Sequence, residues 1–381
     1  MRVLFTGHGA QGHVLPLLGV ARALVSEGHD VLVATAPDLG AMVATHGLET
    51  VAAGMTDDAM VAEANGRWPE TTSSPPSDWT VRMFCEIGAP TMAADLGPVV
   101  DRWRPDLVVR EEGEHGGPIA AAAAGVPWVT HGWGSPLPAA DAVAELGRLV
   151  APAWEAAGLR PPSGPALYGA AVLDPCPPSL YATKPSLPHR HVVRPWFRDA
   201  PATASEPRPS GRRLAYVGFG TVALFRDPPD VLPFVVDALL GLDFDVTVTT
   251  GSDQLGSELQ ALDPSRVNVA RWVDLGSLLP ACDVVVCHGG AGTVLAALAA
   301  GVPLVLLPRG APSQARMSAA CQARGVGRAV AWPGSNAGQL RDALSDVATS
   351  GELRAAAGAV ATEIAAMPDP STATAVLEGV T

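Results

Sequence analysis

Short apolar runs alternate along the chain with longer segments in which apolar residues recur at helical spacing. The first run, Arg2–Thr6, leads into a glycine-rich turn and then into a helical pattern over Val14–Glu27 that stops at Gly28. A second run, Val31–Ala34, follows directly. A strand, a turn, a helix and a strand in this order predict a βαβ unit with parallel strands and a right-handed crossover.

The alternation continues, stops in the middle of the chain and then resumes. Apolar runs at Leu107–Val109 and Val126–Thr130 flank a helical pattern over Gly117–Ala124. Residues 194–213 are rich in proline and small polar residues and show no periodicity, which is typical of a linker. After the linker the strand–helix alternation resumes with Leu214–Val217.

This pattern predicts an α/β protein with two Rossmann-like, doubly wound domains that face one another across a cleft. We assign residues 1–193 to the N-terminal domain, 194–213 to the linker and 214–381 to the C-terminal domain, whose last helix can pack back on the N-terminal domain. Ligands of parallel sheets bind beyond the carboxyl ends of the strands. The side chains that follow strands are therefore the first candidates for function.

Composition and charge exclude several classes of protein. The 381 residues are 48% hydrophobic, which excludes general disorder, and no apolar run reaches the roughly 18 residues of a membrane span. The N-terminus does not combine a basic start with the long apolar stretch of a signal peptide, and Met1–Phe5 is interpreted as a first strand, so we expect a cytoplasmic protein. The net charge of −13 disfavours nucleic-acid and anionic-membrane partners. The five cysteines form no CxxC pair, which indicates buried free thiols.

The most informative segment is 283–293, Asp-Val-Val-Val-Cys-His-Gly-Gly-Ala-Gly-Thr. It predicts a buried strand, a glycine-rich turn and a helix that starts at Thr293. Glycines let backbone N–H groups approach a ligand closely, and a helix start adds unpaired donors and the positive end of a dipole. A tight turn without a ligand is the alternative, but His288 can donate to a phosphate oxygen and favours an anion site.

This segment and its surroundings resemble the donor-binding signature of inverting glycosyltransferases of the GT-B fold. The similarity is clearest to the calicheamicin-type enzymes, which attach deoxysugars to bacterial natural products. It extends over nearly the whole chain and is strongest over residues 267–330. The resemblance implies a nucleoside-diphosphate sugar as co-substrate, a small-molecule aglycone as acceptor and no cofactor. A homodimer is compatible with it.

The resemblance also assigns roles to individual residues. The motif would hold the donor diphosphate through His288 and the backbone, Trp272 would stack on the nucleotide base, and the backbone of Val273 would read the edge of the base. Thr221, after the first strand of its domain, would reach a phosphate. For Trp272 the alternative is an ordinary core position. The assigned donor residues are Thr221, Trp272, Val273, His288, Gly290, Ala291, Gly292, Thr293, Ser313 and Gln314.

No metal site is expected, because a helix dipole and a histidine can stabilise the departing diphosphate. Asp243-Phe-Asp245 precedes a strand and is interpreted as a turn. Ser313 stands where relatives that use glucose-type donors usually have an aspartate, and a serine cannot accept two hydrogen bonds as a carboxylate does. We therefore expect a TDP-linked deoxysugar as the donor.

The predicted catalytic base is His13, in Gly12-His-Val-Leu-Pro16, which matches the family's base position. A histidine suits this role because its unperturbed pKa lies near neutrality. Glu111 matches the carboxylate that orients the base, and its neighbour Glu112 is the reserve candidate. His8 could contact the donor, although a plain turn residue is the preferred interpretation.

The acceptor side is the least defined part. Residues 55–100 and 128–155 are rich in tryptophan and could line an apolar cavity, although core packing explains any single one. Residues 66–80 are interpreted as a mobile loop that could fold over the acceptor. Three alternatives remain: a C-glycosyltransferase with Asp141 as its acid, a nucleotide-sugar epimerase of the same fold, and a non-catalytic binding partner.

Overall fold

The computed structural model describes the following residues: 1–69, 79–183, 185, 187, 189–197, 211–222, 228, 231–331 and 337–381. Most of the predicted linker, residues 198–210, and most of the predicted loop, residues 70–78, lie outside them.

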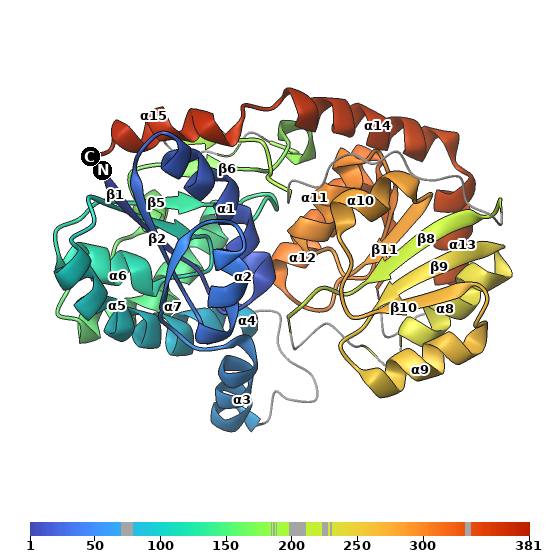
Figure 1. Ribbon diagram of the computed structural model, residues 1–381, viewed down its shortest axis with the longest axis horizontal. Coiled ribbons are helices and arrows are strands. Elements are labelled where there is room, and N and C mark those ends of the chain that lie inside the picture. Colours follow the sequence, from blue (N-terminus) through green and yellow to red (C-terminus); the bar gives the residue numbers. More distant parts are fainter. Residues whose placement is uncertain are drawn as a thin grey trace. The chain divides into compact units, whose positions relative to one another are not determined.

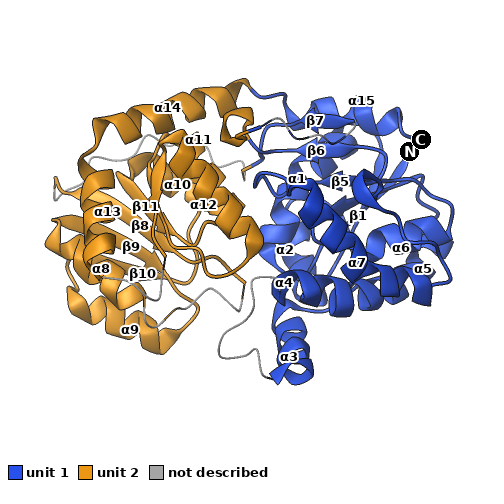
Figure 2. Cartoon of the chain, turned by 180° about the vertical axis from the view of Figure 1, so that it is seen from behind, with its two compact units in different colours: residues 1–176, 183–196, 367–381 blue, residues 177–182, 197–366 orange. Residues whose placement is uncertain are grey.

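The chain divides into two units (Figures 1 and 2). Unit 1 comprises residues 1–176, 183–196 and 367–381, and unit 2 comprises residues 177–182 and 197–366. The division differs from the expected bounds at residues 177–182, which belong to unit 2. Residues 367–381 belong to unit 1, the arrangement that the domain assignment allowed for the last helix.

Unit 1 contains a seven-stranded, wholly parallel sheet with the order β3-β2-β1-β4-β5-β6-β7. Its strands are β1 (Arg2–Thr6), β2 (Asp30–Thr35), β3 (Glu49–Ala52), β4 (Leu107–Glu111), β5 (Trp128–His131), β6 (Val172–Asp174) and β7 (Arg190–Val192). Its helices are α1 (Gln11–Ser26), α2 (Gly40–Ala44), α3 (Asp57–Arg67), α4 (Trp79–Arg82), the π-helical turn η3 (Met83–Gly88), α5 (Ala89–Trp103), α6 (Gly116–Ala123), α7 (Ala140–Ala156) and α15 (Ala373–Glu378).

Unit 2 contains a six-stranded parallel sheet with the order β10-β9-β8-β11-β12-β13. Its strands are β8 (Arg213–Gly218), β9 (Phe244–Thr249), β10 (Val267–Ala270), β11 (Val284–Cys287), β12 (Leu304–Leu306) and β13 (Gly327–Ala329). Its helices are α8 (Leu232–Gly241), α9 (Asp253–Leu262), α10 (Leu275–Leu278), α11 (Ala291–Ala299), α12 (Pro312–Arg324), α13 (Ala337–Thr349) and α14 (Gly351–Ala366).

Both faces of the unit 1 sheet are buried. In β1, Val3 and Phe5 pack with residues of α1 and α15, whereas Leu4 packs with residues of α5 and α6. Successive side chains of a strand point to opposite faces of the sheet, so an uninterrupted apolar run fits a strand that is covered on both sides. Packing on both faces therefore fixes the central strands, and with them the positions of the residues at their carboxyl ends.

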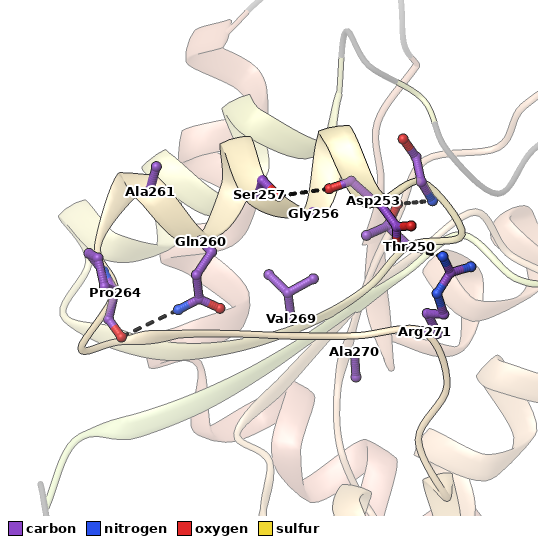
Figure 3. Close-up of a pocket in the computed structure, with 11 residues that line it drawn as sticks. Thr250, Asp253, Gly256, Ser257, Gln260, Ala261, Pro264, Val269, Ala270 and Arg271 are labelled. Atoms are coloured by element: carbon purple, nitrogen blue, oxygen red, sulfur yellow. Dashed lines mark hydrogen bonds and ion pairs between the residues drawn. The ribbon is translucent and has the colours of Figure 1, made fainter.

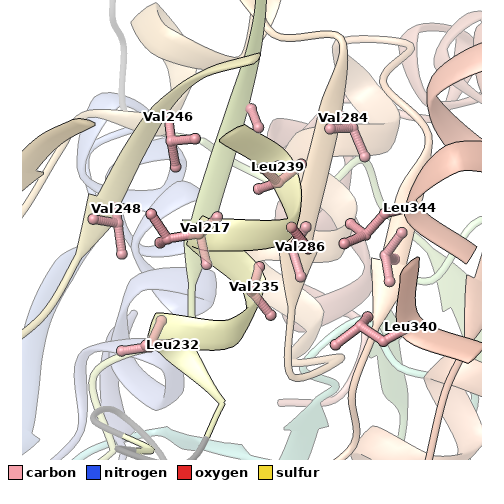
Figure 4. Close-up of a cluster of buried hydrophobic side chains, with 14 of the residues drawn as sticks. Val217, Leu232, Val235, Leu239, Val246, Val248, Val284, Val286, Leu340 and Leu344 are labelled. Carbon is pink, nitrogen blue, oxygen red and sulfur yellow. The ribbon is translucent and has the colours of Figure 1, made fainter. Parts of the chain in front are cut away.

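Unit 2 is built around a cluster of valines and leucines on one face of its sheet (Figure 4). Val217, Val246, Val248, Val284 and Val286 extend from β8, β9 and β11 toward leucines of α8 and α13. Branched side chains pack well on a pleated surface, which favours strands at these runs. Asp243 directly precedes β9, has a positive φ of 62° and forms an ion pair with Arg212. The predicted turn is therefore present at Asp243, whereas Phe244 and Asp245 already belong to β9.

The last segment of the chain returns to unit 1. The helix α15 and the 3-10 helix η7 (Pro370–Thr372) both contact α1. Arg194 donates from its backbone N–H to the carbonyl of Pro368 at 2.6 Å and forms an ion pair with Asp369. No helix within the described part of the chain is both long and apolar enough to cross a membrane.

Candidate active site

His13 and Glu111 meet in unit 1, beyond the carboxyl ends of two neighbouring strands. Glu111 ends β4, which pairs in parallel with β1, and His13 is the third residue of α1, which follows β1. The two side chains form an ion pair, with 2.8 Å between His13 Nδ1 and Glu111 Oε1. The sequence placed His13 in a turn before a helix starting at Val14, and this is wrong, because α1 begins at Gln11.

The expected start followed the apolar pattern, and Gln11, Gly12 and His13 precede its first residue, Val14. A proline is best tolerated in the first turn of a helix. The structure instead has Pro16 inside α1, where it removes one intrahelical hydrogen bond. The gain is a His13 side chain fixed on a helix rather than on a loop.

The ion pair sets the protonation of both partners. Burial alone would lower the pKa of His13, but the charge of Glu111 and its hydrogen bond outweigh burial and raise it. Asp57 and Glu112 raise the pKa of His13 further. Burial would raise the pKa of Glu111, but His13 and the hydrogen bonds lower it to about 2. Glu111 is therefore ionised at neutral pH and accepts from Nδ1, which leaves Nε2 of His13 to take a proton.

The second oxygen of Glu111 is also bound. Oε2 accepts a hydrogen bond from Trp133 Nε1 at 2.5 Å and another from the backbone N–H of Gly113 at 2.5 Å. We did not predict these contacts from the sequence. The available signal was position, because Trp133 comes two residues after β5, the strand next to β4, and parallel strands bring their carboxyl-end residues together.

A buried charged layer lies beneath the pair. The Arg110 side chain is fully buried, and its guanidinium donates to the carbonyls of Glu112 at 2.6 Å and Leu167 at 3.0 Å. The carboxylate of Glu114 accepts from Thr6 Oγ1 at 2.5 Å and from the Gly117 N–H at 3.0 Å. These bonds fix the loop after β4, and with it the position of Glu111.

His8 is not the plain turn residue that the sequence favoured. It is buried, its ring stacks on Phe84 of η3 at 4.6 Å, and its Nε2 lies 2.9 Å from the Gly113 carbonyl. Burial lowers its pKa to about 4, so the ring is neutral at neutral pH. The His8 and His13 rings are 5.9 Å apart, so His8 forms part of the wall around the pair.

The other candidate acids lie elsewhere. Glu112 is buried, and its carboxylate lies 3.5 Å from the backbone N of Trp133 rather than against His13. Asp141, the candidate acid of a C-glycosyltransferase, is exposed in the first turn of α7. Of the predicted carboxylates, Glu111 is the one that the structure joins to His13.

His288 opens the glycine-rich segment of unit 2. It directly follows β11 and is 7% exposed, and burial lowers its pKa to about 4. Glycines surround the ring closely: a Cβ added at Gly220 would lie 2.7 Å from its Cε1, and one added at Gly290 would lie 2.5 Å from its Nε2. These two positions therefore require glycine as long as the ring keeps its place.

The helix that follows begins earlier than predicted. The expected start at Thr293 is wrong, because α11 runs from Ala291 with Gly290 as its N-cap residue. No side chain caps this end, so the first backbone N–H groups have no side-chain acceptor. Ala291, Gly292 and Thr293 thus form the first turn of the helix, where backbone donors and the helix dipole favour an anion.

Three further predicted donor residues lie in loops after strands of the same sheet. Trp272 and Val273 follow β10, and Thr221 follows β8. Trp272 is 52% exposed, which removes the alternative of a core tryptophan. Thr221 is exposed as well, and Val273 is half-buried.

Ser313 and Gln314 lie in the first turn of α12. Ser313 is half-buried. Gln314 is buried, and its Oε1 accepts a hydrogen bond from the backbone N–H of Arg309 at 2.7 Å. The side-chain oxygen of Gln314 therefore fixes the loop before α12, and its amide nitrogen is left as a donor.

A shallow hollow of about 660 Å³ lies along α9 and the edge strand β10 (Figure 3). Its polar lining includes Thr250, Asp253, Gln260 and Arg271, and Arg271 forms an ion pair with Asp253 at 2.5 Å. None of the predicted donor residues lines it. Arg271 precedes Trp272 directly, so the hollow borders the predicted base-binding loop.

The aromatic residues of the expected acceptor side divide into two groups. Trp68, Trp79 and Trp154 are buried, which fits the interpretation that they pack in the core. Trp133 is half-buried, and its ring meets the His13 ring edge-on with centroids 5.0 Å apart. Two aromatic residues of this region, Trp133 and Phe84, therefore contact the His13–Glu111 pair. The ring centroids of Phe84 and His13 are 5.3 Å apart.

Comparisons of sequence give a consistent assignment. The erythromycin biosynthesis protein CIII-like N-terminal domain matches residues 22–186, and the C-terminal domain of the same family matches residues 234–380. The elloramycin glycosyltransferase ElmGT of Streptomyces olivaceus is 31% identical, with 97% of this chain and 95% of that protein covered. The L-demethylnoviosyl transferase of Streptomyces niveus is also 31% identical, over 81% and 79% of the two chains.

Solved structures agree with the sequence comparisons. The glycosyltransferase VinC in complex with dTDP superposes with a TM-score of 0.75 at 27% identity, covering 100% of this chain and 99% of that one. SsfS6 from Streptomyces sp. SF2575, complexed with thymidine diphosphate, superposes with a TM-score of 0.75 at 26% identity. The match covers 100% of this chain and 99% of that one. With its two parallel α/β units, this chain belongs to the erythromycin CIII-like family of GT-B glycosyltransferases of natural-product biosynthesis.

Proposed function

We propose that this enzyme transfers a deoxysugar from a TDP donor to a hydroxyl group of a natural-product aglycone, with His13 as the general base. The observation that carries the proposal is the 2.8 Å contact between His13 Nδ1 and the buried carboxylate of Glu111. A histidine held in this way has a free Nε2 and a counter-charge for the imidazolium that forms. Neither group needs a cofactor to act.

The reaction is a single displacement with inversion. Nε2 of His13 takes the proton of the acceptor hydroxyl as its oxygen attacks the anomeric carbon of the sugar. The new bond between that oxygen and the anomeric carbon forms as the bond from the anomeric carbon to the diphosphate oxygen breaks. The bonding electrons leave with the nucleoside diphosphate, and the proton stays on His13 until it passes to solvent.

Unit 2 is proposed to bind the donor. The first turn of α11, from Ala291 to Thr293, and the His288 ring would hold the diphosphate, and Trp272 would stack on the base. Backbone donors and a helix dipole can stabilise the negative charge of the leaving group without a metal ion. The thymidine diphosphate in the complexes of VinC and SsfS6 supports a TDP donor.

Ser313 supports a deoxysugar. A serine hydroxyl accepts fewer hydrogen bonds than a carboxylate, so it suits a sugar that lacks a hydroxyl or carries another substituent there. The names of relatives support the same class, among them an aclacinomycin-T 2-deoxy-L-fucose transferase of Streptomyces galilaeus, which is 27% identical.

The test has two parts. Thermal shift with TDP, UDP and GDP measures base preference, because a ligand that binds the native state alone raises the melting temperature. Incubation of TDP-deoxysugars with hydroxylated polyketide aglycones then measures TDP release, and the coupling constant of the anomeric proton gives the product configuration. We expect TDP to stabilise most and the product to be inverted. TDP affinity without TDP release in any pairing would favour a non-catalytic binding protein.

A further inference from the structure

The carboxylate of Glu111 is held from three directions. Its Oε1 meets His13 Nδ1 at 2.8 Å, and its Oε2 accepts from the Gly113 N–H and from Trp133 Nε1, each at 2.5 Å. The carboxylate is 1% exposed, so these donors replace water around it. Such bonds to an ionised acceptor are the strong class of hydrogen bond, and together they fix the direction in which Oε1 points.

Trp133 is placed to do more than donate one hydrogen bond. Its indole ring meets the imidazole of His13 edge-on, with ring centroids 5.0 Å apart and an interplanar angle of 70°. It also lies close to Gly113, where an added Cβ would fall 2.5 Å from Cζ2 of the indole. The Trp133 side chain therefore packs near Gly113 and contacts both members of the pair.

We propose that Trp133 is a positioning residue of this glycosyltransferase: its indole N–H locks the Glu111 carboxylate in the orientation that meets His13, and its ring packs against the base. This inference rests on the proposed role of His13. Trp133 acts through Glu111 and His13 and moves no proton itself. The other bond to Oε2 comes from the backbone N–H of Gly113, so Trp133 supplies the bond to this oxygen that a substitution can remove.

Loss of the indole N–H should be visible in the pH dependence of turnover. The charged groups that act on His13 are Glu111 and Glu112 from β4 and its following loop, and Asp57 from α3. The neighbouring titratable group is His8 from the turn after β1, whose ring is neutral near pH 7. The carboxylate of Glu111 is the strongest of the groups that raise the pKa of His13. When Glu111 moves away, the pKa of His13 falls, and the acidic limb of the rate profile moves to lower pH.

The experiment is a double-mutant cycle on the full-length enzyme with a TDP-sugar donor and an aliphatic alcohol acceptor. The variants are Trp133→Phe, Glu111→Gln and the two combined. Phenylalanine keeps an aromatic ring at the site and removes only the N–H donor and the second ring. We expect Trp133→Phe to lower kcat about five- to tenfold, to move the acidic limb to lower pH and to leave TDP affinity unchanged.

In the Glu111→Gln background the same substitution should change kcat less than about twofold, because the group through which Trp133 acts is already lost. Trp128→Phe is the matched control. Trp128 lies in β5, and among the described residues its Nε1 has no hydrogen-bond partner. This control should keep native kcat and the native pH profile.

Gly113→Ala tests the contact between Trp133 and Glu111 without changing Trp133, since the added Cβ would displace the indole. It should reproduce the fall in kcat and the shift of the acidic limb with Trp133 intact. Unchanged kcat and pH profile in Trp133→Phe would overturn the inference, and so would an effect confined to the KM of the acceptor or one fully additive with Glu111→Gln.

Failure of this inference can be told apart from failure of the proposed function. If His13→Ala loses turnover and Trp133→Phe keeps it, the base assignment stands and the positioning role is overturned. If His13→Ala itself keeps native turnover, the base assignment is wrong and the inference falls with it.

Discussion

Each unit places a histidine just beyond an inner strand of its sheet, and the surroundings give the two side chains opposite properties. His13 in unit 1 pairs with an ionised carboxylate, which raises its pKa above the ordinary value. His288 in unit 2 is enclosed by glycines and by Phe219, whose ring centroid lies 6.3 Å away, and burial lowers its pKa to about 4. The same residue type thus has opposite pKa shifts in the first turn of α1 and directly after β11.

The difference lies in the partner. A general base must change charge during each turnover, so it needs a counter-charge that stabilises its protonated form. A residue that holds a phosphate needs only to donate a hydrogen bond, and a neutral ring does so without a change of charge near neutral pH. The pair of ionisable side chains in unit 1 suits the first proposed role, and the neutral ring, glycines and backbone N–H groups of unit 2 suit the second.

The largest expected effect comes from removing the histidine of unit 1. His13→Ala should lower kcat about 10²- to 10⁴-fold, the usual contribution of positioned proton transfer. The affinity for TDP, measured by calorimetry, should stay nearly unchanged, because the proposed donor residues belong to unit 2.

His191→Ala is a control for this substitution, since His191 is an exposed histidine in β7 of the same unit. The acceptor must be an aliphatic alcohol, because a phenol ionises readily and needs less help. Near-native turnover of His13→Ala with such an acceptor would place the base elsewhere.

The second effect, on TDP binding, comes from removing the histidine of unit 2. His288→Ala should weaken TDP binding by about 1.5–3 kcal/mol, the range for a hydrogen bond to a charged group. Because burial lowers the pKa of His288 to about 4, its contribution to binding should be constant between about pH 6 and 8. Isothermal calorimetry at several pH values measures both quantities.

Gly290→Ala should weaken binding in the same direction, because the added Cβ must displace the His288 ring. Gly358→Ala is its control: it lies in α14 of the same unit, and its Cβ would meet nothing within 4 Å. Native TDP affinity in a folded His288→Ala enzyme would contradict the donor assignment.

The third effect makes His13 resemble His288 more closely. Glu111→Gln removes the charge that raises the pKa of His13 and leaves burial, which lowers it. The wild-type rate should fall on the acidic side with an inflection above pH 6.5, and in Glu111→Gln that inflection should move to lower pH. The value of kcat should fall on the order of 10- to 100-fold, the scale of one charged hydrogen bond. An inflection that stays in place in Glu111→Gln would show that Glu111 does not set the pKa of the base.

The smallest effect concerns only donor choice. With Ser313 in place of an acid, turnover with TDP-deoxysugars should exceed turnover with UDP-glucose. Ser313→Asp should narrow the difference by a few-fold, because a carboxylate accepts two hydrogen bonds from adjacent sugar hydroxyls. A donor panel measured by nucleotide release tests this, and a clear preference of the wild-type enzyme for UDP-glucose would reject it.

Much of the fold could be predicted from the sequence, because buried parallel strands consist of unbroken apolar runs such as Val284–Cys287. The family resemblance then pointed to His13, Glu111 and His288; Glu111 was expected after its strand, whereas it is the last residue of β4. Helix starts were predicted two or three residues late at α1 and α11. The first turn of a helix needs no intrahelical N–H bond, so glycines and a histidine can occupy it without a periodic signal.

Contacts between side chains could not be predicted in this way. The pattern left both Glu111 and Glu112 as candidates, because the choice depends on how the loop after β4 is held by Arg110 and Glu114. The bond between Trp133 and Glu111 depends on the indole lying against Gly113. These are packing facts that arise only when three strands and their loops are assembled.

The path of the chain limits how such enzymes can be recombined. It passes between the units after Cys176, Ala182, Trp196 and Ala366, so neither unit is one continuous piece of sequence. Ala373 and Leu377 of α15 are buried in the core of unit 1. A chimera joined at the linker would thus bring the α15 of one parent onto the α1 of the other. A second junction near residue 366 would keep α15 together with the α1 of its own parent.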